Sequence, residues 1–413
     1  MSKKISSWGN IEKLIITNTN NFDSPVIVKG NLNSYGDACL PLEGKFYENK
    51  IISEGMVNPN KTIFEIINKN KFLYAIPGKS NVTIGGAVAA DTHGKDSSWG
   101  GSFINNVEEL DLLISTGEVV RCSRKINSEV FYATVGGYGL TGVISGIKLR
   151  KHDKFFTETY LTKNINGLGI NSLLKNFSNN HGEYSVAWVD LLSKDKNWVL
   201  EISKPIIGSS LKKINIKENN NKELNFSIPI IGKNYLNSLK MINNIFYTFN
   251  SKNKEKISKL EKVLFPLNFV SNTKNISKKR KIVQIQFSIP IQNQHKLNEL
   301  IDCLIFKQKP LLCSVKKLGD CELNNGISFL QNGWTVAVDF SYFEFNEKSI
   351  RNFYKKLIDL EGKIYLAKDS TLNEREFKNM YPAFENWQKI VKDIDPKNIF
   401  QSKMSQRLGI KLG

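Results

Sequence analysis

The spacing of apolar residues changes along the chain, and each change predicts a different kind of element. Up to residue 155, short β-branched runs such as Val26–Val28 and Val107–Ile114 alternate with helical stretches. One helix is expected over Thr62–Lys69, because the hydroxyl of Thr62 can cap the amides that follow it. This mixture of strands and helices is typical of an α+β unit.

The middle of the chain, residues 156–362, has a different texture, with strand-like runs separated by loops rich in Asn and Lys. We interpret this segment as a mostly antiparallel sheet that carries a substrate. The expected strands are 184–189, 283–289 and 334–340, and the expected helices are 236–249 and 295–306.

The last segment, residues 363–413, predicts a short strand at 364–367 followed by two helices at 373–380 and 383–391. These helices are expected to pack back onto the first domain. The chain therefore predicts a first domain made of residues 1–155 and 363–413, interrupted by a second domain of residues 156–362.

Glycines and small hydroxyl residues are concentrated in three stretches of the first domain. These are 28–37, 76–104 and 135–145, and the second of them contains His93. Glycine lets the main chain adopt positive φ and come close to a ligand, and exposed amides at such turns suit a diphosphate or the edge of a flavin ring. A ligand-binding backbone is therefore expected here.

Residues 137–142 match Gly-x-Gly-x-x-Gly, the fingerprint of a Rossmann dinucleotide site. That fingerprint must follow a strand and open a helix. Here a helical stretch, 129–134, precedes the glycines and an apolar strand, 143–149, follows them. The context therefore argues against a Rossmann site.

Composition and charge limit the classes of protein that remain. The chain has 413 residues, is 40% hydrophobic and carries a formal charge of +19. Residues 204–281 contain 17 Lys or Arg and 4 Glu, so 13 of the excess positive charges lie there. This excess fits either a drift of the surface composition toward Lys and Asn, without a function, or attraction to an anionic membrane face. Nucleic acid is disfavoured, because no recognised binding module accompanies the basic residues.

Neither a signal peptide nor a membrane-spanning helix is expected, since no apolar run is long enough. The sequence predicts a cytoplasmic protein that could lie at the periphery of the inner membrane. The 5 cysteines and 4 histidines are scattered. Their spacing indicates neither a disulfide framework nor a metal site.

Several motifs occur in a fixed order along the chain. They are Asn33-Ser34-Tyr35-Gly36-Asp37, Thr92-His93-Gly94-Lys95, Ala133 to Gly142, Gln284-Ile285-Gln286 and Tyr365 to Ser370. Taken together, these motifs resemble the vanillyl-alcohol-oxidase family, whose members share the PCMH-type FAD-binding fold. The resemblance covers most of the chain, and it implies a two-domain FAD enzyme whose cofactor is held without a covalent bond.

The same resemblance implies which residues bind FAD. Most of them lie in the three glycine-rich stretches. They are Gly30, Asn33, Ser34, Tyr35, Gly36, Asp37, Pro77, Gly78, Gly85, Gly86, Ala89, Thr92, His93, Gly94, Ser102, Gly137, Gly139, Gly142, Val143 and Tyr365.

Lys368, Tyr365 and His93 are the predicted catalytic residues. Lys368 matches the family's active-site lysine, although a surface lysine beside Asp369 is the simpler interpretation of the sequence alone. Tyr365 and Lys368 would point to opposite faces of a regular strand, unless the strand ends near Ala367. His93 could instead serve only to shape the pocket.

The predicted substrate residues are uncharged amides, cations and one aromatic ring. Gln284 and Gln286 share one face of a strand, and their amides could bind sugar hydroxyls without titrating. A solvated face is the alternative for both. The full set is Lys95, Trp188, Gln284, Gln286 and Lys316.

The resemblance implies oxidation of a secondary alcohol on a sugar, with the 2′-hydroxyl of a polyprenyl-phosphoryl ribose as the expected donor. A separate keto-reductase would then act on the 2′-keto product. Two alternatives stay open, namely an oxidase of a small soluble sugar such as an aldonolactone and a non-enzymatic flavin-binding protein.

Overall fold

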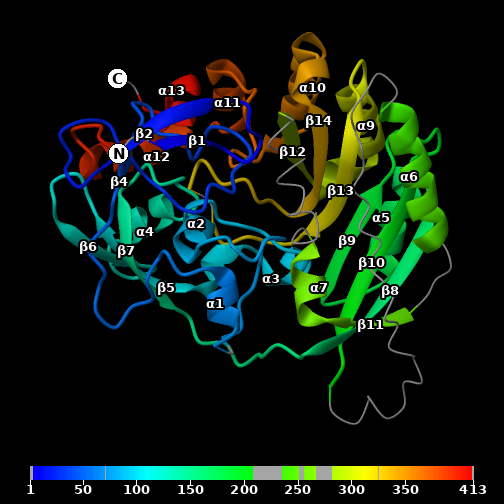
Figure 1. The fold of residues 1–413 in the computed structure, drawn as a ribbon, viewed down its shortest axis with the longest axis horizontal. Helices are drawn as coiled ribbons and strands as arrows, with labels where there is room; N and C mark the ends of the chain where they lie inside the picture. Colours follow the sequence, from blue (N-terminus) through cyan, green and yellow to red (C-terminus); the bar gives the residue numbers. More distant parts are fainter. Residues whose placement is uncertain are drawn as a thin grey trace.

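The computed structural model describes residues 3–69, 71–207, 235–250, 255–266, 281–323 and 325–411. Its polypeptide forms two parts that lie side by side (Figure 1). The sequence also predicts mobile loops at 217–223 and 270–279, within the basic stretch, and both lie outside the described residues. In the part of the chain that is described, no helix is both long and apolar enough to cross a bilayer.

The first part contains two small sheets. A mixed sheet has the order β1-β2-β4-β3, and an antiparallel sheet has the order β6-β5-β7. Its elements are β1 (Lys3–Ser6), β2 (Lys13–Thr19), β3 (Ile27–Val28), β4 (Lys45–Tyr47), α1 (Ile63–Ile67), α2 (Ile84–Ala89), α3 (Ser97–Gly100), β5 (Val107–Leu113), β6 (Val119–Ser123), α4 (Ser128–Thr134) and β7 (Val143–Leu149).

The second part is built on one large sheet with the order β11-β8-β10-β9-β13-β14-β12-β15, in which every pair is antiparallel. Its elements are β8 (Thr159–Leu168), α5 (Ile170–Asn179), β9 (Tyr184–Val189), β10 (Asn197–Pro205), α6 (Tyr235–Asn250), β11 (Glu255–Lys259), α7 (Leu260–Leu264), β12 (Ile282–Pro290), α9 (Leu297–Ile305), β13 (Pro310–Leu318), β14 (Gly333–Ser341), α10 (Glu347–Asp359) and β15 (Lys363–Ile364).

The two faces of the large sheet differ in chemistry. One face is apolar and is covered by α5, α9 and α10, where Phe177 contacts Trp334 and Phe287 contacts Phe353. Side chains alternate along a strand, so the other face carries the polar residues of β12, β13 and β14. The polar face lies toward the first part of the molecule and contributes to the site described below.

The C-terminal segment returns to the first part, and its helices lie beside the N-terminal strands (Figure 1). The backbone of Val26 bonds to that of Ile399 and Gln401, and Trp387 Nε1 donates to the carbonyl of Ala133 in α4. The helices of this segment are α11 (Glu374–Met380), α12 (Phe384–Ile394) and α13 (Lys403–Arg407).

The predicted α+β class and the large antiparallel sheet are confirmed. Thr62 caps α1 as expected, in a reciprocal arrangement with Glu65. The strand predicted at 364–367 is shorter than expected, because β15 ends at Ile364 and the chain turns immediately afterwards. Residues 137–142 follow a helix, α4, and precede a strand, β7, which is not the context of a Rossmann fingerprint.

Candidate active site

The polar face of the large sheet brings several predicted residues together through strand register. Gln284 lies opposite Asp339 and Gln286 opposite Ala337, while Lys316 lies opposite Thr335. Opposite residues of an antiparallel pair point to the same face. The two glutamines and Lys316 therefore lie on the same face of the sheet. The period of two predicted this shared face for the glutamines.

Residues 365–369 cross from this sheet to the first part of the molecule. The Tyr365 amide donates to the Gln286 carbonyl (2.8 Å), and the Lys368 amide to the Tyr365 carbonyl (2.9 Å). The Tyr35 amide donates to the carbonyl of Ala367 (3.1 Å). A Cβ on Gly36 would lie 1.5 Å from the carbonyl oxygen of Asp369, so only glycine permits this approach.

His93 lies at the centre of the contacts between the two parts. Its ring centroid is 5.0 Å from that of Tyr365 and 5.5 Å from that of Phe329. Gln286 Nε2 lies 2.7 Å from His93 Nε2 and also donates to Thr335 Oγ1. An amide nitrogen only donates, so His93 Nε2 accepts and the ring proton is on Nδ1.

Burial, together with the charges of Lys316 and Lys368, holds the pKa of His93 well below its ordinary value. The imidazole is therefore neutral near pH 7. Its Nδ1 is buried and has no hydrogen-bond partner among the described residues, so this group is free to donate to a ligand.

Two buried cations and two buried acids surround this ring. Burial lowers the pKa of Lys368 to about 8, although the charge of Asp339 raises it. Burial and repulsion by Lys368 lower that of Lys316 to about 7. Burial raises the pKa of Asp339 and of Asp96 to about 6. Near pH 7 both acids are therefore ionised while Lys316 is only partly protonated, so the charges around the ring are close to balanced. An anionic ligand would favour the protonated forms of both lysines.

The first glycine-rich stretch forms an open backbone turn beside α2. Within the described residues, the backbone amides of residues 30–33 donate no hydrogen bond. Asn31 Nδ2 donates to the carbonyl of Asn81 (2.7 Å), which joins this turn to the second stretch. A Cβ on Gly30 or Gly86 would lie 3.0 or 2.9 Å from Thr83 Oγ1. The unbonded amides of residues 30–33 fit a diphosphate, and the absence of side chains at Gly30 and Gly86 keeps the space beside Thr83 open.

The third stretch packs directly against α2. The amide of Gly136 donates to the carbonyl of Val88 (3.0 Å) and that of Tyr138 to Ala89 (2.8 Å). A Cβ on Gly142 would lie 2.7 Å from the carbonyl oxygen of Leu113, whereas one on Gly139 would find no atom closer than 3.7 Å. Gly142 is therefore required for packing, and Gly139 is the open position of this loop.

Among the other predicted substrate residues, Lys95 is paired with Glu201 of β10 (2.9 Å) and is close enough to depress the pKa of Lys316. Trp188 lies on β9 opposite Ser314 and contacts Phe246 of α6, at a ring distance of 4.8 Å. The Gln284 amide nitrogen donates to Asp339 Oδ1 (2.5 Å). Both glutamine amide nitrogens are therefore already bonded to protein groups.

Sequence reasoning missed two acids and one arginine around this site. Asp339 is a single charge in an apolar strand, and Asp369 and Arg407 form a buried ion pair (2.9 Å). The alternation within 334–340 could have drawn attention to Asp339, since it shares a face with Thr335 and Ala337.

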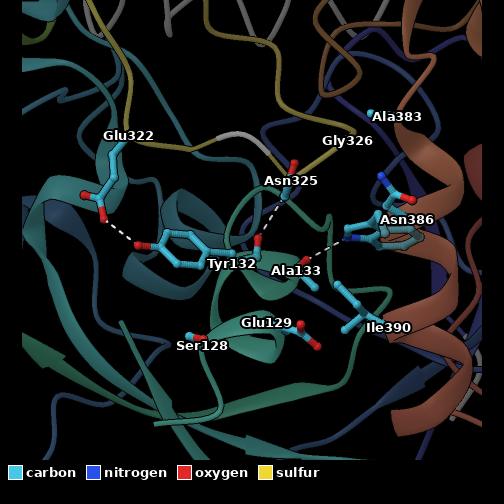
Figure 2. Close-up of a pocket in the computed structure, with 11 residues that line it drawn as sticks. Ser128, Glu129, Tyr132, Ala133, Glu322, Asn325, Gly326, Ala383, Asn386 and Ile390 are labelled. Carbon is cyan, nitrogen blue, oxygen red and sulfur yellow. Dashed lines mark hydrogen bonds between the residues drawn. The ribbon is translucent and has the colours of Figure 1, made fainter. Parts of the chain in front are cut away.

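A surface pocket of about 390 Å³ lies elsewhere, between α4 and α12 (Figure 2). Tyr132 donates to Glu322 across its rim (2.9 Å), and Asn325 Nδ2 donates to the carbonyl of Tyr132. None of the predicted site residues lines it.

Two family models match the chain. One, described as FAD binding domain, covers residues 58–123, and the other, described as D-arabinono-1,4-lactone oxidase, covers residues 334–408. The matches, the fold and the glycine cradle define an FAD-dependent oxidoreductase with a PCMH-type FAD-binding domain.

The chain is similar to decaprenylphosphoryl-β-D-ribose oxidase of Mycolicibacterium smegmatis, with 29% identity over 81% of this chain and 75% of that protein. An uncharacterised protein of Streptomyces coelicolor is 34% identical over 30% of this chain and 33% of its own length. Cytokinin dehydrogenase 2 of Arabidopsis thaliana is 35% identical over 17% of this chain and 14% of its own length. These last two similarities are local.

Proposed function

We propose that this protein oxidises a secondary alcohol of a sugar, and that its donor is the 2′-hydroxyl of a polyprenyl-phosphoryl ribose. The observation that carries the proposal is the similarity to a decaprenylphosphoryl-ribose oxidase over 81% of the chain. The lysines on the polar face of the sheet support it, because a cation suits the phosphate of such a sugar.

The FAD would be held by the three glycine-rich stretches. The amides of 30–33 would bind its phosphate groups, and the turns at Pro77–Gly78 and Gly137–Gly139 would pass along the nucleotide. When bound, FAD would supply the hydride acceptor for the carbinol hydrogen. His93 and Tyr365 would line the reacting end, where the neutral His93 can donate a hydrogen bond from Nδ1.

The substrate would lie over the polar face of the sheet. Lys316 and Lys95 would bind an anionic group, and Trp188 would pack against an apolar portion of the substrate. Lys368 lies beside Tyr35 and His93, and it would stabilise negative charge that develops as the alcohol is oxidised. The 2′-keto product would pass to a separate keto-reductase.

An anaerobic titration tests this function. Purified holoprotein is mixed with polyprenyl-phosphoryl ribose, and bleaching of the flavin absorbance is followed. Rapid bleaching supports the proposal, whereas no bleaching by the lipid-linked sugar contradicts it.

A second candidate is an aldonolactone oxidase, because the lactone-oxidase model matches residues 334–408. A free aldonolactone is therefore titrated in parallel. Bleaching by the lactone alone would favour this second function.

A further inference from the structure

Lys368 and Asp339 both lie near the side chain of Tyr35. The ammonium of Lys368 lies 4.1 Å from the centroid of the Tyr35 ring. Gln284 donates its amide hydrogen to Asp339 Oδ1 (2.5 Å), and the charge of Asp339 acts on both Tyr35 and Lys368. Gln284 thus fixes the carboxylate of Asp339 near the ring against which Lys368 lies.

The surroundings of Asp339 explain why this carboxyl is charged near neutral pH. Lys368 and Lys79 are the cations that favour its ionised form, and the bond from Gln284 acts in the same direction. The acidic side chains that its charge affects are Tyr35 and Cys313, whose pKa values burial raises first and Asp339 raises further. Tyr35 and Cys313 are therefore both protonated and neutral at pH 7, so neither places a second negative charge beside Asp339.

The surroundings of Lys368 are mostly unfavourable to its ammonium form. It is buried, and its charge repels that of Lys316. Among the described residues, Asp339 is the carboxylate whose charge favours the ammonium form of Lys368. Without it, Asp96 would still favour the ammonium form of Lys316, but Lys368 would lose the carboxylate that compensates its charge.

We propose that Asp339 is a positioning residue for Lys368, and that its carboxylate, oriented by Gln284, keeps Lys368 in the ammonium form at the reacting end of the site. Lys368 then acts as a fixed cation rather than as a base. This inference rests on the proposed function only in placing Lys368 next to the substrate.

The test measures the protonation of Lys368 without any substrate. FAD-loaded protein is labelled briefly with acetic anhydride at a series of pH values, and acetylation of Lys368 is quantified by mass spectrometry. Only the neutral amine reacts, so the midpoint of the curve reports the pKa of Lys368. Replacing Asp339 by Asn is expected to lower this midpoint by about half to one unit, which makes labelling at pH 7 about 3- to 6-fold faster.

Two matched variants complete the set. Asp339→Glu retains the charge and is expected to keep the parent midpoint. Asp359→Asn removes an exposed carboxylate from α10 and is also expected to keep it. An unchanged midpoint in Asp339→Asn, or an equal shift in Asp359→Asn, would overturn the proposal.

A second readout uses the reaction itself. In Asp339→Asn, flavin reduction by the sugar should be about 2- to 5-fold slower than in the parent at pH 8 and should recover at pH 6.5, where Lys368 is protonated in both. A purely structural role would slow the reaction equally at both pH values. If the sugar reduces neither protein while the midpoint still shifts, the proposed function fails and the role of Asp339 stands.

If Asp339→Asn does not fold, the reciprocal variant carries the test. Coupling between two titrating groups acts in both directions. Lys368→Met should therefore raise the pKa of Asp339, seen as a protonated carboxyl band in the infrared difference spectrum that persists to higher pH. No such rise would also overturn the proposal.

Discussion

Arg407 provides a sharp test of what holds the two ends of the chain together. Its guanidinium donates through Nε and Nη2 to both carboxylate oxygens of Asp37 (2.8 and 2.7 Å), and Nη2 also pairs with Asp369. The side chain of Asp369 is 0% exposed and that of Arg407 is 24% exposed. Arg407→Met would leave one fully buried carboxylate and one largely buried carboxylate without their cation.

The expected loss follows from that burial. Removing one partner of a buried ion pair costs about 3–5 kcal/mol, and the partial exposure of Arg407 favours the lower half of this range, about 3–4 kcal/mol. An unfolding entropy of roughly 2 cal/mol/K per residue converts this to a fall in Tm of roughly 3–5 °C. The variant should also bind FAD more weakly, because Asp37 and Asp369 end the two segments that meet at Gly36.

Differential scanning calorimetry of the holoprotein measures the change, and flavin retained after gel filtration measures the cofactor. Lys378→Met is the matched control, since it removes a cation of the same segment from an exposed pair with Glu374. That loss should stay below about 1 kcal/mol. A Tm for Arg407→Met within 1 °C of the control would refute the reasoning.

Four further outcomes are expected. Lys368→Met should keep bound FAD and its spectrum, but the substrate should reduce its flavin at least about 100-fold more slowly than in the parent. Lys368→Arg should keep partial activity. A Met variant whose flavin is reduced within a few-fold of the parent rate would remove this lysine from the mechanism. Acid or heat should release the flavin, and flavin that stays on the denatured chain through His93 would contradict non-covalent binding. The pKa is about 7 for Lys316 and about 8 for Lys368, so the unfolded chain binds more protons than the folded one from about pH 7 to pH 10. The Tm of FAD-depleted protein should therefore rise with pH across this window. Lys316→Met should raise the Tm at pH 7. Vesicle binding should require anionic lipid and weaken with salt, and equal binding to neutral vesicles would leave only the surface-drift explanation of the positive charge.

Local patterns predicted the elements best. The cap at Thr62 and the shared face of Gln284 and Gln286 follow from spacing alone, and the structure has both. The early end of β15 was not predictable in this way, because residues 365–367 are apolar enough to continue a strand. The turn is instead fixed by contacts with Gln286 and with Tyr35, which is remote in the sequence.

Residues whose role depends on distant partners were harder to find. The alternation within 334–340 could have singled out Asp339, but its partner Gln284, 55 residues away, is set by the register of β12 and β14. Arg407 and Asp37 are 370 residues apart, and no local pattern connects them. The sequence therefore predicts the glycine cradle more completely than the electrostatic network behind it.

The return of the C-terminal segment has a consequence for biosynthesis. The ribosome delivers Asp37, Val26 and Ala133 long before their partners Arg407, Ile399 and Trp387. The first part of the molecule therefore stays incomplete until the second part has been synthesised. The second part is thus made between the two halves of the first, whose packing is completed last.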